Sequence, residues 1–340
     1  MPMSHQSLAI VSKEEVELFL GLFQHLDGDI YSLLRDAKIP NDILTNRQHY
    51  QYLPETTIKN VLDLMGRASS KEEFALYIWN FCKQVYVPRF VAQLSQESSL
   101  KSALEQFCEK IKLQSSDANM YVTQSGGKWW FVREKQHNDS VWAHFSELFA
   151  VVFMNELLLK LTQGQWAPTE VGIQGDDIES FQCLPQMGPA QLFCGRPVTA
   201  FCIPETMMLS PIVLARQAQA RPKAEDDAKS NSAFPNTFVP SFCLAIKPYL
   251  SMGKLPISLA SDILNIHVRT IQRRLDKEGV TYKKLIEDMV LEQTLELLKY
   301  SDLSITSIGS KMGYSDSSHF TRAFKRQMNM TPRQYRKSYC

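Results

Sequence analysis

The chain has 340 residues, a formal net charge of +1 and an apolar content that is ordinary for a soluble protein. This length is enough for two domains with more than one sizeable core. The most apolar run, residues 145–161, contains Glu147, Glu156 and Lys160, so we expect a buried helix there and no membrane span.

The charge is unevenly distributed. From residue 241 onward there are 16 Lys and Arg against 9 Asp and Glu, whereas the preceding 240 residues hold 21 against 27. A basic C-terminal part and an acidic N-terminal part indicate a division between a nucleic-acid binder and a domain with another task.

The cysteines indicate a reducing environment. There are seven, an odd number, and no two of them have the CxxC spacing. Because the N-terminus also lacks a basic-then-apolar signal segment, we expect reduced thiols and a cytoplasmic protein. Nucleotide-binding loops, zinc-protease motifs, serine nucleophile elbows and paired-cysteine zinc patterns are missing from the sequence, so we expect no enzyme, no cofactor and no metal.

The first part of the chain predicts helices. Ser12 and Glu15 have the spacing of a capping box at the start of the first of them. The apolar spacing predicts helices at residues 12–26, 54–65, 71–84 and 99–111, with a short helix within 36–44.

A change to strands follows. Residues 120–134 predict a β-hairpin, because β-branched and aromatic arms flank Gln124-Ser125-Gly126-Gly127. A helix is expected over 140–162, then short strands at 169–173, at 180–183, around Phe193 and at 198–203. We therefore expect an α+β domain over residues 1–212 and a linker over 213–239, a stretch rich in small and polar residues.

The C-terminal part, residues 240–340, contains two helix-turn-helix patterns, at 257–275 and 305–326. Between them, residues 281–299 have the apolar spacing of one helix. At 1.5 Å per residue this helix is about 28 Å long. Successive major grooves on one face of DNA lie about 34 Å apart. The spacing therefore predicts two recognition helices that enter two major grooves.

The two patterns repeat. Ser261 corresponds to Gly309, where two helices must approach closely. Asn265 corresponds to Gly313, and both residue types accept the left-handed conformation that ends a helix. The second turn has one additional residue.

The second helix of each pattern has an apolar and a polar face. Ile271 and Leu275 correspond to Phe320 and Phe324, and these pairs are expected to hold each helix to its own core. Exposed Arg and Lys also fit a merely solvated face, but the duplication favours DNA recognition. The predicted DNA-contacting residues are His267, Val268, Arg269, Thr270, Gln272, Arg273, Ser317, Ser318, Thr321, Arg322, Lys325 and Arg326.

With these residues, the segment from about Phe238 to Tyr339 resembles the DNA-binding domain of AraC/XylS-type transcription regulators. The motifs that carry the resemblance are Gly313-Tyr314-Ser315-Asp316, Ser318-His319-Phe320, Phe324-Lys325-Arg326, Thr331-Pro332, Tyr335-Arg336, Gly279 and residues 269–275. The resemblance implies binding to double-stranded DNA and, for an activator, a contact with RNA polymerase.

The segment departs from the family pattern at four positions. His267 stands where the family commonly has Ser, and Asn329 where it usually has Gly. Val290 and Thr294 replace a common Arg and Ala on the linking helix, and the change at Val290 removes a polar tie between the two halves.

Residues 20–212 resemble the so-called arabinose-binding N-terminal domain of many such regulators. The residues that carry this resemblance are Ile39-Pro40, Ile43-Leu44, Trp166-Ala167-Pro168, Phe193, Gly195-Arg196-Pro197-Val198, Phe201, Pro204, Leu209 and Pro211-Ile212. The resemblance implies effector sensing or oligomerisation, and it places no pocket.

Trp129, Arg133 and Arg196 are the candidate effector-binding residues. An aromatic ring can line a ligand site, and an arginine can hold a carboxylate through two hydrogen bonds. The alternatives are core packing for Trp129 and surface ion pairs for the two arginines.

We expect an α+β N-terminal sensory domain, with helices and a small antiparallel sheet, joined to an all-α C-terminal domain with two helix-turn-helix units. The predicted function is a sequence-specific DNA-binding transcription regulator controlled by a small-molecule effector, with a homodimer as its assembly. One alternative is an N-terminal domain that only dimerises. The other is a fused enzyme, as in adaptive DNA-repair alkyltransferases, but their N-terminal metal–cysteine chemistry needs close cysteines and the first cysteine here is Cys82.

Overall fold

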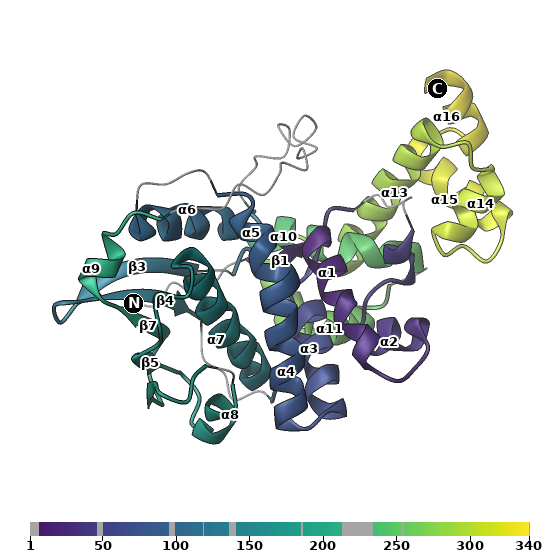
Figure 1. Cartoon of the computed structure of the whole chain (residues 1–340). Helices are drawn as coiled ribbons and strands as arrows, with labels where there is room; N and C mark the ends of the chain where they lie inside the picture. The colour runs from purple at the N-terminus through teal and green to yellow at the C-terminus, as the bar shows by residue number, and fades with distance from the viewer. Residues whose placement is uncertain are drawn as a thin grey trace. The chain divides into compact units, whose positions relative to one another are not determined.

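A computed structural model describes residues 7–45, 50–94, 99–117, 119–135, 141–184, 186–212, 234–252 and 255–339 (Figure 1). The chain forms two compact units. The C-terminal unit contains the described residues of 1–13, 38–56 and 235–340, and the sheet unit those of 14–37 and 57–234. Most of the predicted linker, residues 213–233, lies outside the described residues.

The sheet unit is built around five strands, labelled in Figure 1. They are β3 (Asn119–Ser125), β4 (Lys128–Glu134), β5 (Glu170–Gly172), β6 (Gln191–Phe193) and β7 (Thr199–Ile203), in the order β3-β4-β7-β5-β6. The predicted hairpin is confirmed as β3–β4, with Asn119 opposite Glu134 and Ser125 opposite Lys128. Gly126 and Gly127 form its turn with positive φ angles of 59° and 73°, which glycine adopts without strain.

One predicted strand is wrong. The sequence predicts a strand at residues 180–183, but the structure has the helix α8 (Ile178–Gln182) there. The Asp177 carboxylate begins this helix, accepting hydrogen bonds from Ser180 N at 3.4 Å and from Ser180 Oγ at 2.6 Å. α8 lies between β5 and β6, which pair in parallel, and parallel strands need a crossover connection. The sequence predicts a purely antiparallel sheet, but the parallel pairing of β5 with β6 makes the sheet mixed.

The helices of the sheet unit include those predicted from the sequence, with shifted ends, and two that were not predicted, at residues 30–36 and 205–208. They are α1 (Lys13–Leu20), η1 (Gly21–His25), α2 (Ile30–Asp36), α3 (Thr56–Ala68), α4 (Lys71–Phe81), η3 (Cys82–Tyr86), α5 (Val87–Val91), α6 (Leu100–Lys112), α7 (Val141–Leu161) and α9 (Glu205–Met208). The helix predicted to end at residue 84 continues to Val91 through the π-helical turn η3, just before Pro88, which has no N–H to donate.

The helix α7 supplies much of the core of the sheet unit. Phe149 and Phe153 of α7 contact aromatic rings of α1, α4, η3, α5 and α6, namely Phe19, Phe81, Tyr86, Phe90 and Phe107. This confirms the predicted buried helix. In the part of the chain that the structure describes, no helix is long and apolar enough to cross a membrane.

Glu147 of α7 is buried and acts as a polar anchor. Its Oε1 accepts hydrogen bonds from Gln174 N at 2.6 Å and Thr199 Oγ1 at 2.8 Å, and its Oε2 accepts one from Gly175 N at 2.9 Å. Three donors from two segments of the sheet thus meet one carboxylate, which explains a charged residue inside an apolar helix.

Glu147→Ala should therefore destabilise the sheet unit by several kcal/mol, because each donor left buried without a partner costs about 1–3 kcal/mol. Urea unfolding measures the change. Glu105→Ala is the matched control, since Glu105 makes an exposed pair with Lys101, and such pairs contribute at most about 1 kcal/mol. Equal effects of the two substitutions would show that Glu147 is not an anchor.

The C-terminal unit combines helices with two N-terminal strands. β1 (Ile10–Ser12) and β2 (Tyr52–Pro54) pair antiparallel and contact α10 (Phe238–Ile246). Leu8 N donates to Ser241 Oγ of this helix at 2.8 Å. The unit also contains η2 (Asn41–Leu44), η5 (Lys247–Met252), α11 (Ile257–Leu264), α12 (Val268–Lys277), α13 (Tyr282–Tyr300), α14 (Ile305–Lys311), α15 (Ser317–Met328) and α16 (Pro332–Tyr339). All elements described from residue 238 onward are helical, but the unit that they belong to is completed by residues before position 57.

Candidate nucleic-acid interface

The first helix pair, α11 and α12, is joined by a tight turn. Asn265 ends α11 with φ 52° and ψ 45°, the left-handed conformation that the sequence predicts. Its N–H donates to Asp262 O at 3.4 Å, and Ile266 N donates to Ser261 O at 3.1 Å. Ser261 Oγ also donates to Ile266 O at 2.7 Å, so the serine fixes the turn from both sides.

The second helix pair, α14 and α15, has the same turn. Gly313 has φ 79°, and its N–H donates to Ser310 O at 3.0 Å. Tyr314 N donates to Gly309 O, also at 3.0 Å, as Ile266 N does to Ser261 O in the first pair. The two turns therefore close with the same pair of backbone hydrogen bonds.

Gly309 marks the close approach in the second pair. A Cβ at this position would lie 3.0 Å from Phe320 Cγ and 3.1 Å from Phe320 Cβ, a distance that requires the ring to move. Phe320 is buried, and it packs with Tyr314 and Phe324 in a cluster that includes Leu297 and Leu298 of α13. The absence of a side chain is thus what lets α14 contact α15.

The helices α12 and α15 begin differently. Asp316 caps α15: its Oδ1 accepts a hydrogen bond from His319 N at 2.7 Å. This bond is the main reason that the pKa of Asp316 is lowered. His267 occupies the same position before α12, but its side chain makes no capping hydrogen bond. Only α15 therefore has a carboxylate of its own at the positive end of the helix.

The predicted DNA-contacting residues lie on the open faces of the two helices. In α12 and at its start, His267, Arg269, Gln272 and Arg273 are exposed and Val268 and Thr270 half-buried. In α15, Ser317, Ser318, Arg322, Lys325 and Arg326 are exposed and Thr321 is half-buried. The residues predicted as their supports, Ile271, Leu275, Phe320 and Phe324, are all buried.

A groove runs along the open face of α12. Ser261, His267, Val268, Arg269, Thr270 and Arg273 line it, and a second depression is lined by Arg269, Gln272, Arg273, Asp276 and Lys277. Ser261, Asp276 and Lys277 were not predicted as part of this surface. Arg274 is turned away from it, with its guanidinium carbon 5.2 Å from the centroid of the Phe238 ring. Helical periodicity also places the adjacent Arg273 and Arg274 on different faces of α12.

The helix α13 links the two pairs over 19 residues, and Thr281 Oγ1 caps it by accepting a hydrogen bond from Lys284 N. This confirms the predicted linking helix. Beyond its end, Arg336 of α16 donates to three backbone oxygens: Leu298 O at 3.1 Å, Leu303 O at 2.7 Å and Ser301 O at 3.4 Å. This arginine thus connects α16 with the end of α13 and with the segment between α13 and α14.

The candidate effector-binding residues lie in the sheet unit. Trp129 and Arg133 share one face of β4 with Phe131, which contacts Phe107 of α6. The Trp129 Nε1 is buried and has no hydrogen-bond partner among the described residues, and Lys101 Nζ lies 5.9 Å from the ring centroid. Arg196 is exposed and lies over the Phe193 ring at 5.3 Å, between β6 and β7.

Gly309→Ala should destabilise the second helix pair by about 1–3 kcal/mol, because an added methyl group overpacks against Phe320. Thermal melting of the full chain, followed by circular dichroism, measures it. Gly21→Ala is the control, since a Cβ at Gly21 has no atom within 4 Å. A melting curve that Gly309→Ala leaves unchanged would contradict the close packing of Gly309 against Phe320.

Comparisons with known proteins concern the same segment. A family described as "Helix-turn-helix domain" matches residues 260–338. The transcriptional activator RhaS of Escherichia coli is 35% identical over 77 residues, which are 22% of this chain and 28% of RhaS. The transcriptional regulator VirS of Mycobacterium tuberculosis is 38% identical over 87 residues, 26% of each chain. The match thus spans about a quarter of the length of these relatives.

Solved structures are also similar. The transcriptional regulator CdpR from Pseudomonas aeruginosa is 15% identical, with a TM-score of 0.36 over 92% of this chain and 99% of CdpR. The C-terminal domain of AraT from Geobacillus stearothermophilus is 27% identical, with a TM-score of 0.27 over 29% of this chain and 84% of that domain.

Proposed function

We propose that this chain is a transcription regulator of the AraC/XylS type, which its C-terminal segment resembles, and that it binds specific DNA sites through two helix-turn-helix units, α11–α12 and α14–α15. The observation that carries the proposal is the repeated turn. Both pairs close it with the same two backbone hydrogen bonds and present a polar, basic helix face opposite a buried apolar one. Such a face suits phosphate and base contacts in a major groove.

The length of α13 supports binding to two grooves. Its 19 residues correspond to about 28 Å, close to the roughly 34 Å that separates successive major grooves on one face of DNA. A single chain would then cover two half-sites, and the homodimer would be an addition to this binding mode, not a requirement for it.

The two helix pairs are proposed to divide their work. Arg269, Gln272 and Arg273 offer guanidinium and amide groups suited to guanine and adenine edges. The α15 face offers mostly hydroxyls, with Lys325 and Arg326 toward its end, and such groups position a protein on phosphates more than they discriminate bases. The Asp316 cap limits this role to the far end of α15, because a carboxylate at the helix start repels a phosphate there, whereas Lys325 and Arg326 lie in the last turn.

The full chain should protect specific duplex sites in a footprint at moderate salt, and its affinity should fall steeply as salt rises, because phosphate contacts release counterions. Folded protein that gives no protected region in a genomic library would contradict the proposal.

Arg273→Ala should weaken binding to the preferred site by about 1–3 kcal/mol and relax the base preference at one position. Lys325→Ala should weaken all sites alike and reduce the salt slope by about one unit. Selection from randomised DNA measures both. Arg274→Lys, which keeps a charge next to Phe238, is the control. If Lys325→Ala changes the selected sequence and Arg273→Ala does not, the division of labour is wrong.

The sheet unit is proposed to sense a small-molecule effector. The observation that favours sensing over dimerisation alone is the buried Trp129 Nε1, a donor without a partner among the described residues. An indole N–H suits an acceptor such as a carboxylate. A ligand that binds the native state raises the melting temperature, so a thermal-shift screen of small carboxylates, with Trp129→Phe as the comparison, separates this proposal from a purely dimerising domain. Activation through RNA polymerase belongs to the same proposal.

A further inference from the structure

The first helix of the first pair, α11, ends with backbone carbonyls that have no helical partner. Its turn supplies two donors, the N–H groups of Asn265 and Ile266, which reach Asp262 O and Ser261 O. The turn must be held in one geometry because it sets the angle at which α12 leaves α11. Additional donors at this end would fix that angle further.

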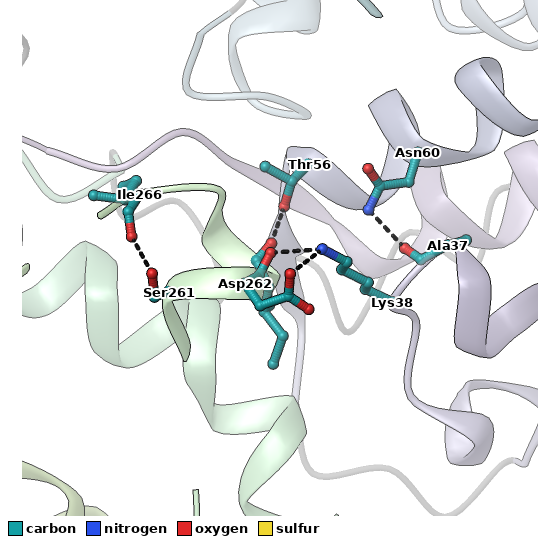
Figure 2. A network of polar contacts seen from close by, with 8 residues as sticks. Ala37, Lys38, Thr56, Asn60, Ser261, Asp262 and Ile266 are labelled. Atoms are coloured by element: carbon teal, nitrogen blue, oxygen red, sulfur yellow. Dashed lines mark hydrogen bonds and ion pairs between the residues drawn. The ribbon is translucent and has the colours of Figure 1, made fainter. Parts of the chain in front are cut away.

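Residues of the N-terminal segment 38–56 supply these donors (Figure 2). Lys38 Nζ donates to Asp262 O at 2.8 Å and to Asp262 Oδ1 at 2.7 Å. Thr56 Oγ1 donates to Ile263 O at 2.8 Å. Figure 2 shows both side chains pointing toward the end of α11, next to the Ser261–Ile266 hydrogen bond of the turn. A cation at this position also interacts favourably with the negative end of the helix dipole.

Lys38 is held in place by its own backbone. Its φ is 58°, a left-handed conformation that non-glycine residues rarely adopt. The buried Tyr249 hydroxyl donates to Lys38 O at 2.7 Å and so secures this conformation. A strained residue maintained by a specific tertiary contact is typical of positions where a precise geometry matters.

The segment that carries Lys38 and Thr56 is continuous with the sheet unit at both ends. Ala37 precedes it and Thr57 follows it, and both belong to that unit. There the amide of Asn60 donates to Ala37 O at 3.0 Å, so a hydrogen bond connects α3 with the residue before Lys38 (Figure 2). A shift of α2 or α3 would therefore reach Lys38 and Thr56 through the peptide bonds at 37–38 and 56–57. The hydrogen bonds of these two residues would pass it on to the α11–α12 turn.

The second helix pair is held differently. The carbonyls at the end of α14 accept hydrogen bonds from Met312, Gly313 and Tyr314, residues of its own turn. We propose that Lys38 and Thr56 are positioning residues for base recognition by α12, and that they couple the sheet unit to the first helix pair alone. This inference rests on the proposed DNA-binding function and adds its route of regulation.

The test uses the full chain with Lys38→Met combined with Thr56→Val, which removes the donors while keeping side-chain size. We expect affinity for the selected DNA site to fall about fivefold or more, in the range of typical coupling between sites. Base preference should relax only in the half-site at which Arg273→Ala relaxes it, while the other half-site keeps its preference. Selection from randomised DNA and binding titration measure these effects.

Three comparisons make the test decisive. Lys38→Arg with Thr56→Ser should restore wild-type binding, since both donors return. Arg35→Met, three residues away on α2, should leave binding unchanged. Unchanged preference in the Lys38→Met, Thr56→Val variant, an equal loss at both half-sites, or tighter binding would overturn the inference. Absence of specific binding by the wild-type chain would instead overturn the proposed function.

Discussion

The helices α12 and α15 each depend on the burial of two apolar residues one turn apart. α12 has 10 residues and α15 has 12, lengths at which an isolated helix is marginal in water. The pairs Ile271 with Leu275 and Phe320 with Phe324 attach them to their cores. Every polar group on the opposite face is presented at a defined angle only because these four side chains are buried. Gly309 serves the same purpose in the second pair, since a Cβ there would press against the Phe320 ring.

The polar groups inside the protein follow the same logic of satisfied partners. Glu147 is buried with three donors, and Arg336 is bonded to three carbonyls. Glu15 is a further case: burial raises the pKa of its carboxyl group, which bonds to Tyr86 and Arg89 next to the π-helical turn. In each case a charged group connects segments distant in sequence, and the geometry of the connection is more specific than apolar contact would be.

Local signals in the sequence predicted local structure well. The glycine pair between β3 and β4, the repeated turn at Asn265 and Gly313 and the apolar spacing of α13 each have a physical cause within a few residues. The failures had distant causes. The composition of residues 180–183 is typical of a short strand, but the structure has the helix α8 there. This helix belongs to the crossover that the parallel pairing of β5 and β6 requires. The role of Lys38 has no local signal, since its partner Asp262 is 224 residues away.

The crossing of the chain between its two units constrains how such a protein can be rearranged. β1 and β2 contact α10, and segment 38–56 contacts α11. In the sequence, β1 precedes the sheet unit, and segment 38–56, which includes β2, interrupts it. A gene fragment that begins at the basic C-terminal part would encode all of the proposed DNA-contacting residues and still expose the face of α10 that these strands bury. Exchange of the N-terminal part between relatives by a single cut before α10 would then separate α10 and α11 from the strands and side chains that contact them. A hybrid regulator keeps this unit intact only if residues 1–13 and 38–56 are transferred together with the C-terminal helices.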